Sequence, residues 1–146
     1  MNRPSSFNDF NQALIEDFRA NRGQVSSGPF VGRPILLLTT TGAKSGGERT
    51  MPLAYTRDRD SYIVIASKGG APTNPGWFHN LIAHPVVTVE VGPEKFQARA
   101  SVVEDAQRRR LYDAHAEVLP VFADYEKKTS RRIPVIRLER IDSSRN

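Results

Sequence analysis

Two different periods of apolar residues run along this chain. Near the N-terminus, four apolar residues recur at spacings of three and four: Phe7, Phe10, Leu14 and Phe18. That spacing is the period of one face of an α-helix. We therefore expect an amphipathic helix within residues 1–22, with a capping box of Ser6 and Asp9 at its start and Gly23 at its end.

From residue 34 onward, short runs rich in branched apolar residues and threonine replace the helical period, and such runs are typical of strands. The segments that we expect as strands are 34–41, 49–57, 61–67, 86–91, 95–103 and 133–141. Residues 61–67 form a nearly continuous apolar run, so we place that strand at the centre of the sheet. The turn at Gly92 and Pro93 predicts a hairpin between the fourth and fifth strands.

Three helical segments are expected among the later strands, at 77–83, at 104–118 and from Pro120 onward. The apolar face that we expect on the second of them consists of Ala106, Leu111, Ala114 and Val118. The regular strand–helix alternation of a parallel sheet is missing. The pattern therefore predicts a mainly β, α+β fold, with about six mostly antiparallel strands closed into a barrel between the N-terminal helix and the late helices.

The composition narrows the possible chemistry. A length of 146 residues suits one domain, which we expect to span residues 1–146 with its barrel at 31–141. Because the chain has no cysteine, disulfides, thiolate nucleophiles and cysteine-ligated metals are excluded. No apolar run is long enough to cross a bilayer, and the N-terminus lacks the apolar core of a secretory signal, so we expect a cytoplasmic protein.

The formal net charge of +5 is spread along the chain rather than gathered in one arm. A basic surface attracts any polyanion, so nucleic acid, anionic lipid and an anionic cofactor are all compatible with it. No basic recognition helix or stacking platform is visible, so we expect no nucleic acid partner. The histidines are scattered, and His79 and His84 lack the i, i+4 spacing of helical metal ligands, so we expect no metal site.

Residues 39–52, TTTGAKSGGERTMP, are the most informative stretch for binding. A strand leads into a glycine-rich turn whose backbone N–H groups can form an anion-binding nest, with Lys44 and Arg49 adding charge. It is not a Walker A loop, because Ala43 rather than glycine precedes the lysine. A solvated hairpin turn accounts for the same residues equally well.

Two later stretches also suit an anionic or planar ligand. Residues 66–80 form a long glycine-rich loop followed by a helix that begins near Trp77; a core-facing tryptophan under a long connection is the slightly favoured alternative. Residues 122–132 place a basic cluster beside Tyr125, and this cluster is either a solvated charged face or a rim for a polycarboxylate. The cluster consists of Lys127, Lys128, Arg131 and Arg132.

Taken in order, three segments resemble the deazaflavin (F420)-dependent nitroreductase family of actinobacteria. They are LLLTTTGAKSGGERTMPLAY, YIVIASKGGAPTNPGWFHNLIAHPVVTVEVG and FADYEKKTSRRIPVIRLE, and together they cover about residues 31–141. The resemblance implies a split β-barrel related to FMN-binding barrels. It also implies coenzyme F420, a deazaflavin with a phosphodiester and an oligoglutamate tail, as hydride carrier.

The activity that the resemblance implies is reduction of a planar hydrophobic electrophile, such as a quinone or a nitro compound, by reduced F420. Two alternatives stay open: an oxidoreductase that uses FMN on the same barrel, and a non-catalytic protein that binds deazaflavin or lipid. The sequence does not choose the physiological acceptor. It also leaves open a homodimer.

The resemblance implies a set of cofactor-binding positions along the two motifs. They are Ala43, Lys44, Ser45, Arg49, Thr50, Met51, Pro52, Leu53, Ala54, Ile65, Ala66, Ser67, Lys68, Gly76, Trp77, Phe78, His79 and Asn80. Lys44, Ser45 and Arg49 would hold the phosphate. Met51 and Pro52 would lie against the ring or the ribityl chain.

For catalysis, a hydrogen-bond donor must stabilise the negative charge that a hydride brings to the acceptor. Ser67 is the first candidate for this donor and Tyr125 is the second, with simple packing as the alternative for the tyrosine. The acceptor pocket would be lined by Phe18, Phe122 and Tyr125. No nucleophile or metal is needed for such a reaction.

One departure from the family pattern bears on the acceptor. Relatives active on bicyclic nitroimidazoles carry several tyrosines at helical spacing in the late segment, where this chain has Leu119, Phe122 and Tyr125. Two hydroxyls are lost, which favours a more apolar acceptor such as a quinone. The N-terminal helix would pack on the barrel; a lid, a dimer contact or a peripheral contact with the inner face of the cell membrane are the alternatives.

Overall fold

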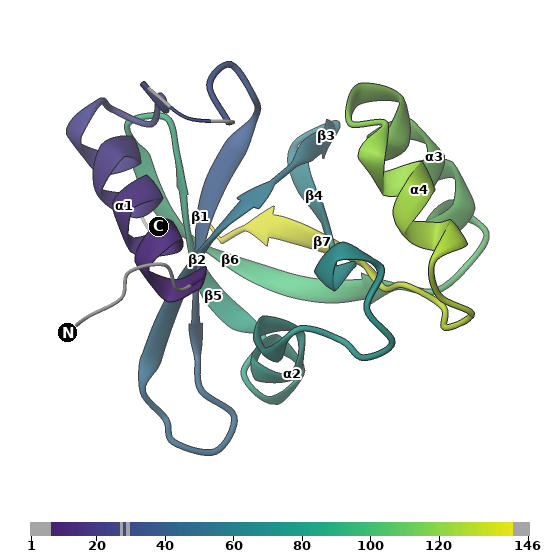
Figure 1. Cartoon of the computed structure of the whole chain (residues 1–146). Helices are drawn as coiled ribbons and strands as arrows, with labels where there is room; N and C mark the ends of the chain where they lie inside the picture. Colours follow the sequence, from purple (N-terminus) through teal and green to yellow (C-terminus); the bar gives the residue numbers. More distant parts are fainter. Residues whose placement is uncertain (1–6, 27, 29, 142–146) are drawn as a thin grey trace, which may run out of the picture.

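The computed structural model describes residues 7–26, 28 and 30–141, and within them one sheet is flanked by helices (Figure 1). Its strands are β1 (Ile35–Thr41), β2 (Glu48–Ala54), β3 (Thr56–Asp58), β4 (Ser61–Ile65), β5 (Val86–Val91), β6 (Glu94–Val103) and β7 (Val135–Arg140). Its helices are α1 (Phe7–Ala20), α2 (Gly76–Ala83), α3 (Gln107–Val118) and α4 (Val121–Lys127), with a 3₁₀ turn η1 (Lys68–Gly70). Of the predicted capping box, Ser6 lies outside the described residues.

The strand order is β2-β1-β5-β6-β7-β4-β3, and every neighbouring pair is antiparallel. The strands at the two ends of this order, β2 and β3, are separated in sequence only by Tyr55. A chain can pass from one edge of a sheet to the other across one residue only where the sheet curls until its edges meet. The sheet is therefore a barrel that is split along the β2–β3 junction, which confirms the predicted fold class.

This junction explains why a single strand was expected at 49–57. The run is continuous in sequence, but Ala54 pairs with Ile35 in β1 and Thr56 pairs with Ile63 in β4. The N–H of Tyr55 donates to the carbonyl of Pro34 at 3.0 Å, one step beyond the last β1–β2 pair, and the next residue already pairs with β4. One predicted strand is thus two strands at opposite edges.

The expectation that residues 61–67 form a central strand is wrong. β4 lies between β7 and the edge strand β3, although all five of its residues are buried. Its run is apolar because both faces are covered: Tyr62 and Val64 point into the barrel core, whereas Ile63 and Ile65 pack under α3 and α4. The nearly continuous apolar run therefore reflects burial on both faces of β4, and not a central position in the sheet.

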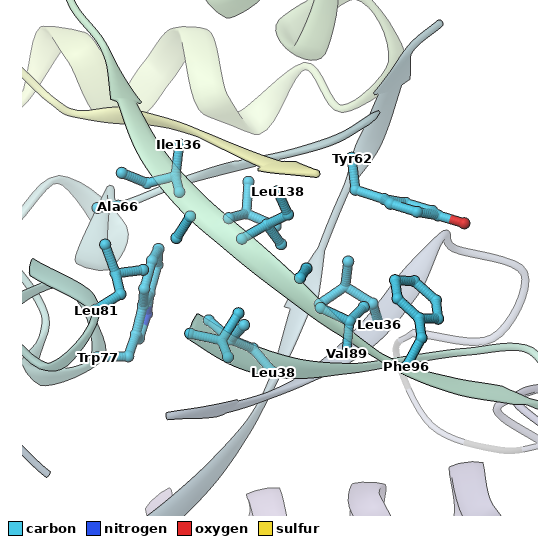
Figure 2. Packing of buried hydrophobic residues seen from close by; sticks show 14 residues of the cluster. Leu36, Leu38, Tyr62, Ala66, Trp77, Leu81, Val89, Phe96, Ile136 and Leu138 are labelled. Atoms are coloured by element: carbon cyan, nitrogen blue, oxygen red, sulfur yellow. The ribbon is translucent and has the colours of Figure 1, made fainter. Parts of the chain in front are cut away.

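The barrel core is filled by alternate residues of the strands (Figure 2). Leu36 and Leu38 point inward with Val89, Phe96, Ile136 and Leu138, and Trp77 and Leu81 of α2 close one end beside Ala66. Ile35 and Leu37 point outward and are covered by α1. The two helical covers, α1 on one side and α3 with α4 on the other, stand on opposite sides of the sheet in Figure 1.

The predicted apolar face of α3 is confirmed only at Leu111, because Ala106, Ala114 and Val118 are exposed. The buried residues of this helix are Arg108, Leu111, Tyr112 and His115, whereas Val118 is 58% exposed. Some polar groups on this face have internal partners: the Tyr112 hydroxyl donates to the carbonyl of Phe122 at 2.8 Å, and Arg108 Nη2 donates to the carbonyl of Ile133 at 2.6 Å. Arg108 Nε and His115 Nε2 are buried without a hydrogen bond to the described residues. A pattern of apolar residues alone cannot identify a face built from buried polar side chains. None of the helices in the described part of the chain is long and apolar enough to span a bilayer.

Candidate functional site

A cavity of about 730 Å³ opens between the two helical covers. Its walls come from α1, from β2, from the loop that follows β4, from the start of α2 and from α4. All six residues from 49 to 54 contribute to it. Because successive strand residues point to opposite faces, a lining of consecutive residues means that the cavity runs along the free edge of β2.

Most of the positions implied for cofactor binding line this one cavity, although they come from segments far apart in sequence. They are Arg49, Thr50, Met51, Pro52, Leu53, Ala54, Ile65, Ser67, Lys68, Gly76, Trp77 and Asn80. Phe122 and Tyr125, expected at the acceptor, line it as well. The fold therefore brings the two motifs and the late helix to a common site.

The charged residues that line the cavity are all positive. Its lining includes Arg33, Arg49 and Lys68 but no aspartate or glutamate. Lys68 Nζ donates to the Thr73 hydroxyl at 3.2 Å, and within the described residues neither arginine forms a salt bridge. Cations without carboxylate partners, beside largely apolar walls, suit a ligand with an anionic group and a planar apolar body.

The glycine-rich turn between β1 and β2 is held mainly by its own hydrogen bonds. The Ser45 hydroxyl accepts from the N–H of Gly47 at 3.1 Å, and the Asn80 side-chain oxygen accepts from the N–H of Ala43 at 2.9 Å. Neither Ala43, Lys44 nor Ser45 lines the cavity. Their role in holding a phosphate therefore stays a prediction, whereas Asn80 explains how α2 fixes this turn beside the cavity.

The loop after β4 supplies Ser67 and Lys68 in an unusual backbone conformation. Lys68 has φ of 49°, and Gly69 and Gly70 follow at 65° and 85°. A lysine with positive φ is uncommon, and it needs support from its surroundings. Ser67 is 6% exposed, and its hydroxyl has no hydrogen bond to the part of the chain that the structure describes, so it remains available to a ligand.

Residues at successive turns of the α4 region form the opposite wall. Leu119, Phe122 and Tyr125 all line the cavity. The Phe122 ring stands edge-on to Tyr125 at 5.2 Å and to His115 at 4.5 Å between centroids. His115 is fully buried, its Nδ1 lies 2.8 Å from the Thr56 hydroxyl, and burial lowers its pKa to about 4. The imidazole is therefore neutral near pH 7 and supports the aromatic wall without adding charge.

Besides Ala43, Lys44 and Ser45, four positions expected at the site do not line the cavity. Ala66 is buried in the barrel core, and Phe78 and His79 lie on α2 away from the cavity lining. Phe18, expected in the acceptor pocket, is 1% exposed and packs between α1 and β1. Trp77 lines the cavity, but it is 6% exposed and belongs to the core. This agrees with the alternative of a core-facing tryptophan under a long connection.

Sequence reasoning missed Asn11 as a site residue. It lines the cavity, is 7% exposed, and its Nδ2 lies 3.7 Å from the Met51 sulfur. A thioether is a weak acceptor, so this amide has donor capacity left for a ligand. The available signal was a polar residue between Phe10 and Leu14, on the face of the helix that should be apolar.

A second cavity of about 470 Å³ lies at the end of β3 and has a different character. Asp58 there forms ion pairs with Arg137 at 2.9 Å and with Arg110 at 3.4 Å. The hydrogen bond from Arg137 is the main cause that holds the pKa of Asp58 below its usual value. Because its charges already compensate one another, this cavity is the weaker candidate. No group of potential metal ligands gathers anywhere in the described residues.

Comparisons with known proteins identify the family of this chain. The chain belongs to the F420H(2)-dependent quinone reductase family, whose sequence model matches residues 12–140. Members of this family are oxidoreductases named for their dependence on coenzyme F420.

The F420H(2)-dependent quinone reductase Rv1261c of Mycobacterium tuberculosis (strain ATCC 25618 / H37Rv) is 41% identical over 126 residues, which are 84% of this chain and 85% of that protein. The putative F420H(2)-dependent quinone reductase Rv3178 of the same strain is 36% identical over 103 residues, which are 70% of this chain and 87% of that protein.

Solved structures resemble the fold at two levels of sequence similarity. An F420-H2 dependent reductase, FDR-A, is 41% identical with a TM-score of 0.68, over 73% of this chain and 95% of that one. A structure described as a domain-swapped dimer is 36% identical with a TM-score of 0.71, over 88% and 93% of the two chains. HutZ, a heme storage protein from Vibrio cholerae, shares the fold at 17% identity and a TM-score of 0.59.

Proposed function

We propose that this chain catalyses hydride transfer from reduced coenzyme F420 to a quinone. Membership of the quinone reductase family gives the class of reaction. The observation that carries the proposal for this chain is the cavity itself, which combines apolar walls with three cations and no carboxylate in its lining. A deazaflavin with a phosphodiester and an acidic tail matches both properties, so the residues present fit that cofactor.

Arg49 and Lys68 would bind the anionic part of the cofactor, because both reach the cavity and both lack a carboxylate partner within the described residues. Met51 and Pro52 would pack against its planar part. The cofactor, when bound, supplies the hydride. The protein positions the two reactants and keeps water from the reacting atoms by the apolar walls of β2 and α4.

The acceptor would lie against the apolar residues of α1 and α4, among them Leu14, Leu119 and Phe122. Reduction of a quinone requires one hydride and one proton, and negative charge develops on a quinone oxygen before the proton arrives. The candidate hydrogen-bond donors to that oxygen are Ser67, Tyr125 and Asn11, which all line the cavity. Such a donor stabilises the transition state by electrostatic preorganisation.

The mouth of the cavity also suggests how an apolar acceptor arrives. Phe10 and Val121 both line the cavity and are 42% and 39% exposed. An apolar rim beside Arg33 suits the surface of an anionic membrane, where a hydrophobic quinone would be held. We therefore extend the proposal to a peripheral membrane contact through α1, tested by flotation with anionic and neutral vesicles. Binding of the protein to vesicles that changes neither with the Phe10→Ser substitution nor with the charge of the lipid would contradict this proposal.

A second copy of the chain is the other proposed partner, supported by the similar structure described as a domain-swapped dimer. Light scattering after size-exclusion chromatography measures this directly. A monomer at every concentration tested would contradict it.

The function is tested by titrating the protein with F420 and, separately, with FMN, followed by oxidation of reduced cofactor with menadione as acceptor. We expect selective binding of F420 and menadione-dependent turnover. Binding of F420 without turnover of menadione or other quinones would indicate a carrier. Selective binding of FMN would place the chain on a different cofactor.

A further inference from the structure

Arg131, in the connection between α4 and β7, points into the protein rather than into the basic cluster predicted around it. Its guanidinium donates to three acceptors in the loop that follows β4: Nε to the carbonyl of Ala71 at 2.8 Å, Nη1 to Asn74 Oδ1 at 2.5 Å, and Nη2 to the carbonyl of Ser67 at 2.9 Å. A longer contact of 3.3 Å joins Nη2 to the carbonyl of Ala66. One side chain therefore fixes both ends of this loop.

The contacts are unusual because none of them is an ion pair. Among the described residues, no carboxylate lies within salt-bridge distance of Arg131, and burial lowers its pKa. Removing a guanidinium from water without a counter-ion is unfavourable unless its hydrogen bonds are replaced. Here backbone carbonyls and one amide replace them, so the charge of Arg131 serves to hold the loop.

The loop needs such support. Lys68 adopts a φ of 49° between the two carbonyls that Arg131 holds, those of Ser67 and Ala71. A non-glycine residue in this conformation persists only where the surroundings determine it. Gly70 packs closely against the end of α4, because a Cβ there would lie 2.9 Å from the Cβ of Lys128. The loop therefore contacts the end of α4 at Gly70 and the segment after α4 through Arg131.

The loop carries Ser67, Lys68 and Gly69 into the cavity, and α4 carries Phe122 and Tyr125 into the same cavity from the other side. We infer that Arg131 is a positioning residue for the cofactor: it sets the distance between these two walls and presents Lys68 and Ser67 for binding. It touches neither reactant and acts through the loop backbone. This inference rests on the proposed function for the identity of the ligand, but not for the ordering of the loop.

The test uses Arg131→Gln and Arg131→Lys, with Arg132→Gln as the matched control. Arg132 is exposed, and within the described residues its side chain forms one hydrogen bond, of 3.3 Å to the carbonyl of Glu104. Amide hydrogen exchange of the cofactor-free protein measures the order of residues 66–75. Calorimetric titration measures the affinity for F420, and steady-state kinetics with menadione separate kcat from KM.

For Arg131→Gln we expect exchange in residues 66–75 to accelerate about tenfold or more while exchange in β5 and β6 is unchanged. The Kd for F420 and the KM for its reduced form should rise by about tenfold or more, with a smaller change in kcat. Arg131→Lys should fall between, because an ammonium cannot reach three acceptors in one plane. Arg132→Gln should match the wild type in every measurement.

Unchanged loop exchange and F420 affinity in Arg131→Gln would overturn the inference, and so would faster exchange spread evenly over the whole sheet. If Arg131→Gln does not fold, Asn74→Ala removes one acceptor of the same guanidinium and should still accelerate exchange in the loop. Its failure to do so would equally overturn the inference. If the wild type does not bind F420, the proposed function fails, while the exchange experiment still decides whether Arg131 orders the loop.

Discussion

Replacement of Asn11 by leucine tests the acceptor side of the site directly, because it should raise the stability of the protein and lower its activity. The amide is 7% exposed, and its one hydrogen bond within the described residues is the 3.7 Å contact with the Met51 sulfur. A leucine of similar size would bury apolar surface where a poorly satisfied amide now lies. We expect the free energy of unfolding to rise by about 1 kcal/mol.

Catalysis should respond in the other direction. A hydrogen bond to a charged oxygen contributes about 1.5–3 kcal/mol, so its loss from the transition state should lower kcat/KM for menadione by about 10- to 150-fold. The affinity for F420 should change little, because Arg49 and Lys68 are untouched. Gln12→Leu, at an exposed position one residue further along α1, is the matched control.

The assay combines urea unfolding, titration with F420, and initial rates over a range of menadione concentrations. Unchanged kcat/KM in Asn11→Leu would refute the role of this amide, and the donor would then be sought among Ser67 and Tyr125 by their alanine and phenylalanine variants. Loss of stability together with activity would mean that the amide has a structural partner, which would contradict the argument from its weak contact.

Three further predictions address the cofactor, the acceptor and acid stability. Arg49→Ala should weaken F420 binding by about tenfold or more, and added salt should reduce the difference in affinity between the variant and the wild type. Arg59→Ala, in the second cavity, should not affect F420 binding. Calorimetry at two salt concentrations checks both expectations. Phe122→Tyr should raise activity on nitroimidazoles relative to menadione by restoring a hydroxyl to the acceptor wall, and an unchanged ratio of kcat/KM values would count against that assignment. Because burial lowers the pKa of His115 to about 4 from an ordinary value of 6.5, the unfolded chain takes up this proton first as pH falls. The stability due to neutral His115 is therefore complete above pH 6.5 and declines toward pH 4, by about 2 kcal/mol at pH 5. His115→Gln should remove that part of the pH dependence in urea unfolding, and an equal slope in the variant would show that another group is responsible.

The fold could be predicted largely because apolar periods and turn residues report local structure directly. Helix α1, the β5–β6 hairpin around Pro93 and the start of α4 at Pro120 all follow from local spacing. Tyr55 shows the limit of that reasoning. Nothing in the run from Arg49 to Arg57 signals that the chain crosses from one edge of the sheet to the other, because the crossing depends on the curl of the whole sheet.

The candidate site was predicted in part for the same reason. Contiguous residues such as those of β2 are carried to the cavity together, so a motif locates all of them. Asn11 and Arg33 were missed because only the packing of α1 and the preceding loop against the barrel brings them there. Arg131 was grouped with its charged neighbours because sequence does not show which arginine turns inward.

The free edge of β2 has a consequence for how the site can vary. Half of the peptide groups of an edge strand point away from its only neighbour, and β2 is an edge strand whose residues 49–54 all line the cavity. A ligand that pairs with these N–H and C=O groups is recognised by the main chain, which side-chain substitution does not remove. Contacts of this kind to the cofactor would therefore persist when the side chains of β2 are substituted. Pro52, which lacks an N–H, also blunts the edge against pairing with a strand of another molecule.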